Sequence, residues 1–113
     1  MASTGDDKKS TVLVPADAVG VYYIGSDLYV IVLGVAYGGT TDIHIEREPF
    51  PGGLKFAIKG ELGEVAGFQP YCVEYVEKDI QIPSRTFPSK SIIFEDAEHP
   101  LGYVIPIKFF GLG

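Results

Sequence analysis

Two short stretches of the sequence hold imidazole and carboxylate groups close enough together to do chemistry. In Asp42-x-His44-x-Glu46 the polar residues alternate with isoleucines, so on a strand they share one face. These ligand types suit Zn²⁺ or Fe²⁺. The hairpin expected here, however, gives Asp42 and Glu46 a lysine partner each, and lysine competes with a cation. A solvated polar face is therefore the favoured interpretation, and no metal site is predicted at these weak candidates.

The second stretch is the acidic loop Glu95-Asp96-x-Glu98-His99. Its carboxylates are hard oxygen ligands of the kind that Ca²⁺ takes, although a complete calcium site needs about six to eight oxygens. The spacing matches no EF-hand loop, and acidic loops on acidic proteins are commonly solvated. These four residues are the best candidates in the chain for a cation or a polar ligand. Apart from Ca²⁺ at this loop, no cofactor is expected.

The single cysteine, Cys72, needs a nearby base to act as a nucleophile, and only His44 and His99 offer an imidazole. On a strand over 71–77 it shares a face with Glu74, whose charge disfavours the thiolate. A small structural thiol is the favoured interpretation. The sequence also lacks the Gly-x-Ser-x-Gly, P-loop and Rossmann glycine patterns, so no catalytic residue is predicted.

The composition indicates that strands position these residues. Val and Ile total 22 against 14 for Leu and Ala, and all 14 aromatic residues are Phe or Tyr. Branched and aromatic side chains suit a pleated sheet, and the 14 glycines and 8 prolines imply frequent turns. A chain of 113 residues is sufficient for one domain with one modest core.

The charge balance narrows the range of partners. Nine Lys and Arg against 15 Asp and Glu give a formal net charge of −6. Nucleic acids and anionic membrane surfaces both require a cationic face, so neither is an expected partner. One cysteine cannot form an internal disulfide, and the N-terminal residues lack the apolar segment of a signal peptide. These features predict a cytoplasmic protein, with secretion after removal of a leader left open.

The expected organisation is a flexible tail over residues 1–11 and one domain over residues 12–113. Apolar runs and turn signals alternate through that domain, with no helical period. The predicted fold is a single antiparallel β-sandwich, immunoglobulin-like or jelly-roll-like, of about seven to nine strands; a small β-barrel is the alternative. The candidate strands cover residues 12–14, 19–24, 28–37, 41–47, 54–61, 71–77, 79–82, 91–95 and 103–110.

The clearest hairpin joins 41–47 to 54–61. Antiparallel pairing must keep the apolar side chains on one face, which restricts the register. The register chosen on this rule also pairs opposite charges across the strands. Its apolar and charged pairs are Ile45–Phe56, Ile43–Ile58, Glu46–Lys55 and Asp42–Lys59.

A second hairpin joins 19–24 to 28–33, with its turn at Gly25-Ser26-Asp27. The run 28–37 is apolar on both faces, whereas a sheet of a two-layer antiparallel domain normally leaves one face to water. Both faces therefore need a cover, and a domain of this size has little chain left to provide the second.

The second face has three candidate covers. Loops carrying Phe50, Phe68 and Phe87 could lie over it, or a second subunit could. Insertion into a bilayer is disfavoured, because the positions facing a lumen would then be polar and here they are not.

The C-terminal strand, 103–110, contains Pro106, so it should lie at a sheet edge or be bulged. Its apolar end should dock on the core or on a neighbouring subunit. We therefore predict a non-enzymatic binding or assembly module that acts as a homo-oligomer, with a carbohydrate or a protein as ligand. The alternative is a small enzyme or small-molecule carrier with an aromatic-lined interior pocket. The expected subunit interface contains Tyr22, Tyr29, Ile31, Leu33, Phe109 and Phe110.

Overall fold

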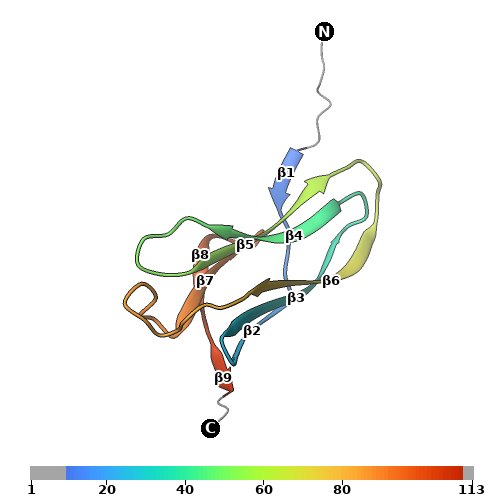
Figure 1. The fold of residues 1–113 in the computed structure, drawn as a ribbon. Coiled ribbons are helices and arrows are strands. Elements are labelled where there is room, and N and C mark those ends of the chain that lie inside the picture. The colour runs from blue at the N-terminus through green and yellow to red at the C-terminus, as the bar shows by residue number, and fades with distance from the viewer. Residues whose placement is uncertain (1–9, 111–113) are drawn as a thin grey trace.

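The computed structural model describes residues 10–110, which form nine strands in two sheets packed against each other (Figure 1). The prediction of an all-β fold is confirmed. The two sheets do not close into a barrel, so that alternative is wrong. The strands are β1 (Ser10–Leu13), β2 (Ala18–Ile24), β3 (Asp27–Tyr37), β4 (Thr41–Glu48), β5 (Lys55–Leu62), β6 (Phe68–Glu77), β7 (Ser91–Asp96), β8 (His99–Pro106) and β9 (Lys108–Phe110).

Each sheet mixes antiparallel and parallel pairs. In sheet A, β5 pairs with β4 along one edge and with β1 and β7 along the other, and β8 follows β7. In sheet B the order is β6-β3-β2-β9. The pairs β5–β7 and β2–β9 are parallel, which the predicted antiparallel arrangement did not include. Across residues 10–110 we find no helix with the length and apolar character to cross a membrane.

The core lies between the two sheets and takes alternate residues from strands such as β3 and β7, as period-two side-chain direction requires. In β3, Leu28, Val30 and Val32 are fully buried. They belong to one hydrophobic cluster with Phe56 and Phe94 of sheet A. One face of β3 is therefore covered by the second layer of the same chain.

The β2–β3 hairpin is confirmed, with a tighter turn than expected. Asp27 already pairs with Ile24, which leaves only Gly25 and Ser26 in the turn. Gly25 has a φ of 65°, a left-handed conformation that glycine adopts without steric cost.

The segment 79–82 is not a strand, although Ile80 and Ile82 are both buried. Asp79 has a φ of 56°, which takes the chain out of the extended conformation. The backbone bonds to a turn and a side chain instead of a ladder: Ile80 N–H donates to Ser26 O at 2.9 Å, and the Tyr23 hydroxyl donates to Ile80 O at 2.7 Å. The two isoleucines therefore belong to the core without being part of a sheet.

The predicted strand 103–110 is divided between the two sheets. β8 pairs with β7 at the edge of sheet A and ends at Pro106, in agreement with the edge position expected for this proline. Ile107 is buried, and its N–H donates to Lys90 O at 2.9 Å. The chain then enters sheet B as β9, so the apolar end docks beside β2 of its own chain.

The N-terminal boundary also differs from the expected one. Ser10 and Thr11, assigned to the tail on sequence grounds, pair with Leu62 and Glu61 as part of β1. The rest of the predicted tail, residues 1–9, lies outside the described part of the chain, as do residues 111–113.

Truncating a core side chain tests this packing. We expect Phe94→Ala to lower the free energy of unfolding by about 3–5 kcal/mol, because it removes a fully buried ring between the sheets. Urea denaturation followed by circular dichroism measures the change. Leu101→Ala is the control: Leu101 is 94% exposed, so its loss should change stability by less than about 0.5 kcal/mol. Equal effects of the two substitutions would contradict the position of the core.

Candidate functional site

The β4–β5 hairpin forms as predicted, but its register is displaced by two residues. Ile45 lies opposite Ile58 instead of Phe56. A two-residue shift keeps every side chain on its expected face, so hydrophobic alternation does not distinguish the two registers. The ladder is irregular around Asp42, whose φ is 54°.

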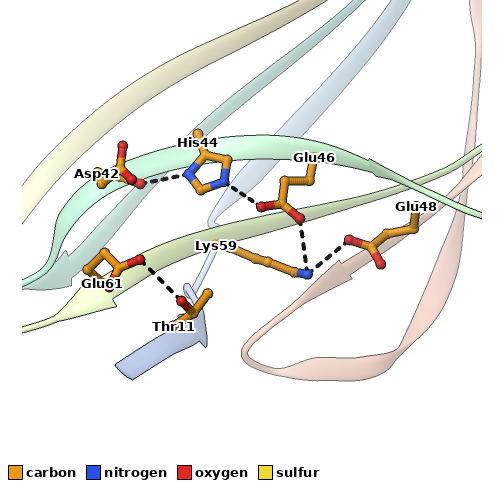
Figure 2. Close-up of polar contacts among 7 residues, drawn as sticks. All are labelled: Thr11, Asp42, His44, Glu46, Glu48, Lys59 and Glu61. Carbon is orange, nitrogen blue, oxygen red and sulfur yellow. Dashed lines mark hydrogen bonds and ion pairs between the residues drawn. The ribbon is translucent and has the colours of Figure 1, made fainter. Parts of the chain in front are cut away.

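The observed register places Lys59 between two glutamates on the outer face of sheet A (Figure 2). Its Nζ lies 3.2 Å from Glu46 Oε1 and 3.0 Å from Glu48 Oε2. Glu46 also contacts His44, with 2.7 Å between its Oε2 and the histidine Nε2. One lysine thus balances two carboxylates, and a histidine completes the network.

The charge pairs expected from the sequence do not form. Lys59 pairs with Glu46 and Glu48 rather than Asp42, and Lys55 pairs with Glu95 at 3.0 Å rather than with Glu46. Opposite charges still face each other on this surface, as the composition of the two strands requires, but the partners follow the displaced register.

Both ring nitrogens of His44 face oxygen acceptors. Nδ1 lies 2.7 Å from the backbone oxygen of Asp42, and Nε2 contacts the Glu46 carboxylate. An imidazole donates at both nitrogens only when it is protonated. The hydrogen bond to the Asp42 carbonyl and then the one to Glu46 raise the pKa of His44 above 6.5. In return, His44 and then Lys59 lower the pKa of Glu46.

This geometry argues against the metal site considered for Asp42, His44 and Glu46. Both nitrogens of His44 already have partners, and Glu46 is neutralised by His44 and Lys59. Asp42 contributes its backbone oxygen, not its carboxylate, to the contact with His44. These side chains stabilise the outer face of sheet A.

The acidic loop is the turn between β7 and β8, and Asp96 organises it. Its carboxylate is fully buried. Oδ1 accepts hydrogen bonds from the backbone N–H groups of Glu98 and His99, both at 2.9 Å, and lies 3.0 Å from His99 Nδ1. Asp96 Oδ2 has no hydrogen-bond partner among residues 10–110. An aspartate that accepts from the backbone N–H groups following it is a typical turn-stabilising residue.

The four residues proposed for a cation are not brought together. Glu95 lies on the other face of β7 from Asp96 and pairs with Lys55. Glu98 is exposed and contributes only its backbone to the Asp96 contact. Within the described part of the chain, no three His, Cys, Asp or Glu side chains gather in a way that could hold a metal ion.

Two tyrosine hydroxyls share the environment of Asp96. Burial and then the Asp96 charge raise the pKa of Tyr103. Burial, followed by the charges of Asp17 and Asp96, raises the pKa of Tyr71, whose hydroxyl donates to the Pro15 carbonyl oxygen. Both hydroxyls therefore stay protonated, and this end of the core has the character of a structural polar cluster.

Cys72 is separated from both histidines. It is exposed in β6 of sheet B, where it lies opposite Leu33 of β3. His44 and His99 belong to sheet A and are engaged with Glu46 and Asp96. No nucleophile–base pair forms between them, and the thiol is on the surface instead of in a packed structural position.

The outer face of β3 is uncovered for half of its length. Tyr29 and Ile31 are half-buried, whereas Leu33, Val35 and Tyr37 are 48%, 42% and 56% exposed. Such side chains are normally buried or paired with a partner when they form a continuous patch.

The loops proposed as a cover do not provide one. Phe68 belongs to β6, is itself 71% exposed and packs on Tyr37 with 5.3 Å between ring centroids. Phe50 lies in the β4–β5 turn near Lys55 of sheet A. Phe87 packs against the core and the Arg47 guanidinium.

Neighbouring strands extend this patch across the sheet. On β6, Phe68, Pro70, Cys72 and Val76 lie opposite the outward residues of β3. On the other side, the rings of Tyr22 and Phe110 lie 6.1 Å apart. We call this surface the apolar face of sheet B; it consists of Tyr22, Ile24, Tyr29, Ile31, Leu33, Val35, Tyr37, Phe68, Pro70, Cys72, Val76 and Phe110.

Five of the six residues predicted for a subunit interface lie on this face. The exception is Phe109, which points to the other side of β9 and contacts the Tyr23 ring at 5.5 Å. Sequence reasoning missed Val35 and Tyr37, although continued alternation from Leu33 could have found them. It also missed Phe68 and Val76, because only the pairing of β6 with β3 brings them to this surface.

Three hollows lie on the surface of the 10–110 segment. One of about 390 Å³ lies beside β1, between exposed Tyr37 and exposed Glu98, and its lining is mostly aliphatic. Others of about 400 and 430 Å³ adjoin the 79–87 segment. His44, Cys72 and His99 line none of these three.

Comparison of the chain with protein-family models, with curated proteins and with solved structures finds no match in any of the three. The surfaces described above are therefore the basis for assigning a function.

The protonation of His44 gives a first test. We expect its NMR titration midpoint above 6.5, and a lower midpoint in Glu46→Gln, because the substitution removes the charged acceptor. Since the folded-state pKa is raised, the stabilisation is fully present below 6.5 and is lost as the pH rises through the folded-state pKa. The stability difference between the wild type and His44→Gln should therefore be larger at about pH 5.5 than at about pH 8.5.

Glu61→Gln is the matched control for that titration. Glu61 lies on the neighbouring strand and accepts a hydrogen bond from Thr11, away from His44 (Figure 2). This variant should leave the His44 midpoint unchanged. An equal shift in both variants would show that general surface charge, not the contact with Glu46, sets the pKa.

The buried turn aspartate gives a second test. Asp96→Ala removes an acceptor of two backbone hydrogen bonds and should lower the free energy of unfolding by about 2–4 kcal/mol. Glu98→Ala, in the same turn but exposed, should change it by less than about 0.5 kcal/mol. Chemical denaturation measures both. If Ca²⁺ instead stabilised the wild type and not Asp96→Ala, the turn would be a cation site after all.

Proposed function

We propose that this protein is a non-enzymatic assembly module that acts as a homo-oligomer, with the apolar face of sheet B as its subunit contact. The observation that carries this proposal is the exposure of Leu33, Val35 and Tyr37 on β3, an inner strand of a four-stranded sheet. Water around such a continuous apolar surface is unfavourable, and burying it against a partner stabilises the complex.

The contrast between the two outer faces supports the proposal. The outer face of sheet A carries His44, Glu46, Glu48 and Lys59 in a connected network of charge pairs. Such a face is stable in water. The outer face of sheet B has no comparable network among its described residues, so the two layers are not equivalent toward solvent.

A second copy of the chain is the occupant we favour. β3 has eleven residues and thus spans about 36 Å, and four strands about 4.8 Å apart are about 19 Å wide. The face therefore offers at most roughly 700 Å², close to the about 800 Å² that each partner contributes to a standard interface. Two such sheets can pack face to face about 10 Å apart, in the same way as the layers of one domain.

We assign the two-layered fold to the β-sandwich class, supported by the core between the sheets and by the repeated passage of the chain from one sheet to the other. We also propose a reducing compartment such as the cytoplasm. The support is Cys72, an exposed thiol within the proposed contact, which an oxidising compartment would modify or cross-link.

The alternative of an enzyme or a carrier has less support. It required His44, Cys72 or His99 to face a cavity, but none of the three lines the hollows described above. His44 and His99 are engaged with Glu46 and Asp96, and Cys72 is exposed on sheet B. It also required an aromatic-lined interior, whereas the hollow beside β1 has Tyr37 as its aromatic residue and is bounded by exposed side chains.

The oligomeric state is the direct test. Sedimentation velocity over a range of concentrations should show a dimer for the wild type. Leu33→Lys should raise the dissociation constant at least about 100-fold, because it places a charge in the middle of the contact. The substitution is at an exposed position of the monomer, so the fold should be retained and circular dichroism checks this.

Leu101→Lys is the matched control, since Leu101 is an exposed leucine of sheet A, outside the proposed contact. It should dimerise like the wild type. A wild-type protein that is monomeric up to millimolar concentration, or a Leu101→Lys variant as defective as Leu33→Lys, would overturn the proposal.

A further inference from the structure

We propose that two copies of sheet B pack around a two-fold axis that runs along the strands, so that Glu74 of each copy pairs with Lys108 of the other. This inference rests on the proposed function and specifies its geometry. It follows from the positions of the charged residues on an otherwise apolar surface.

Glu74 and Lys108 stand at opposite margins of the apolar face. Glu74 is exposed in β6, next to Ile31 of β3. Lys108 lies in β9 next to Tyr22, and its Nζ is 6.0 Å from the centre of the Tyr22 ring, which places the ammonium group on the outer side of the sheet. Neither side chain forms an ion pair with another residue of the 10–110 segment.

Two other charged residues lie at the end of this sheet, Asp27 at the start of β3 and exposed Lys78 directly after β6. Asp27 begins β3, and its Oδ1 accepts a hydrogen bond from the Asp79 N–H at 3.1 Å. The Asp27 carboxylate therefore already binds the backbone of the segment that follows β6. Glu74 and Lys108, which form no ion pair within residues 10–110, flank the apolar residues.

The strand order determines which charges meet in a dimer. A two-fold axis parallel to the strands and between β3 and β2 exchanges the margins, so that β6 of one copy lies over β9 of the other. Glu74 and Lys108 are three strands apart, about 14 Å, and two residues apart along the strands, about 7 Å. After the rotation the offset along the strands and the separation of about 10 Å between the sheets remain, a span that a glutamate and a lysine side chain can bridge together. The symmetry produces this pair twice.

The other face-to-face arrangement places like charges together. An axis that crosses the strands puts β6 over β6 and β9 over β9, so Glu74 approaches its own copy and Lys108 does the same. Like charges brought together at an interface oppose association. The strand-parallel axis brings the two Asp27 side chains near each other at the end of the sheet, where solvent screens their charges.

These pairs would lie at the rim of the contact, where an ion pair contributes little to affinity but selects the orientation. The apolar residues between them supply the free energy of association. Glu74 and Lys108 therefore act mainly by disfavouring the alternative axis. Reversing one of the two charges should weaken association, because it places like charges together.

Charge reversal tests the pairing by sedimentation. Glu74→Lys and Lys108→Glu should each raise the dissociation constant about 10-fold or more, because each creates two like-charge contacts per dimer. The double reversal should restore it to within about threefold of the wild type. Glu64→Lys is the control, since it makes the same charge change in an exposed loop outside sheet B and should have no comparable effect.

Cysteine cross-linking separates the two axes directly. In a Cys72→Ser background, Glu74→Cys and Lys108→Cys proteins mixed with a bis-maleimide about 10 Å long should form predominantly the mixed cross-linked dimer, because the facing positions are too far apart for a disulfide. Predominant cross-linking of Glu74→Cys to itself would overturn the strand-parallel axis. Single reversals without effect, or a double reversal without rescue, would also overturn the strand-parallel axis. These results would leave the proposed homodimer itself unaffected. A wild-type protein that never dimerises would remove the proposed function itself.

Discussion

The hydrophobic contact between two sheets is the constraint on which the rest of this structure depends. Side chains alternate along each strand, so a layer that buries one face against the core must present its other face outward. Leu28, Val30 and Val32 use the inner face of β3, and Leu33 and Val35, further along the strand, belong to the outer one. The chain forms only two layers over residues 10–110, and therefore nothing in that segment covers the outer side of sheet B.

The imidazole, lysine and carboxylate side chains that could take part in chemistry have structural roles in this fold. His44 links the Asp42 carbonyl to Glu46, and Lys59 joins two carboxylates on the outer face of sheet A. Asp96 is buried and holds the β7–β8 turn. Because His44, Glu46 and Lys59 pair with one another and Asp96 Oδ1 accepts from the backbone of its turn, these polar groups fit stabilisation better than catalysis. The apolar face of sheet B, by contrast, is exposed to water without a cover from residues 10–110.

The β4–β5 hairpin shows what the alternation of apolar and polar residues can predict and what it cannot. It identified the two strands and the face of every residue, yet placed Ile45 opposite Phe56 instead of Ile58. The hydrophobic pattern is nearly unchanged by a shift of two residues, and the irregular backbone at Asp42 has no comparable signal in the sequence. The segment 79–82 failed for a related reason: Ile80 and Ile82 alternate and are buried, but their backbone bonds to a turn rather than to a strand.

The sequence alone determined the all-β class, both hairpins, the edge position of the strand that contains Pro106 and the two-sided apolar character of the run 28–37, because each depends on side-chain period or on local backbone chemistry. Only the tertiary structure decided the parallel pairs, the passage of β9 into the second sheet and the place of β6 beside β3. These features join segments far apart in the chain, and their free energy comes from contacts that no local pattern encodes. The pairing of β6 with β3 brings Phe68 next to Tyr37 and extends the apolar surface of β3 across the sheet.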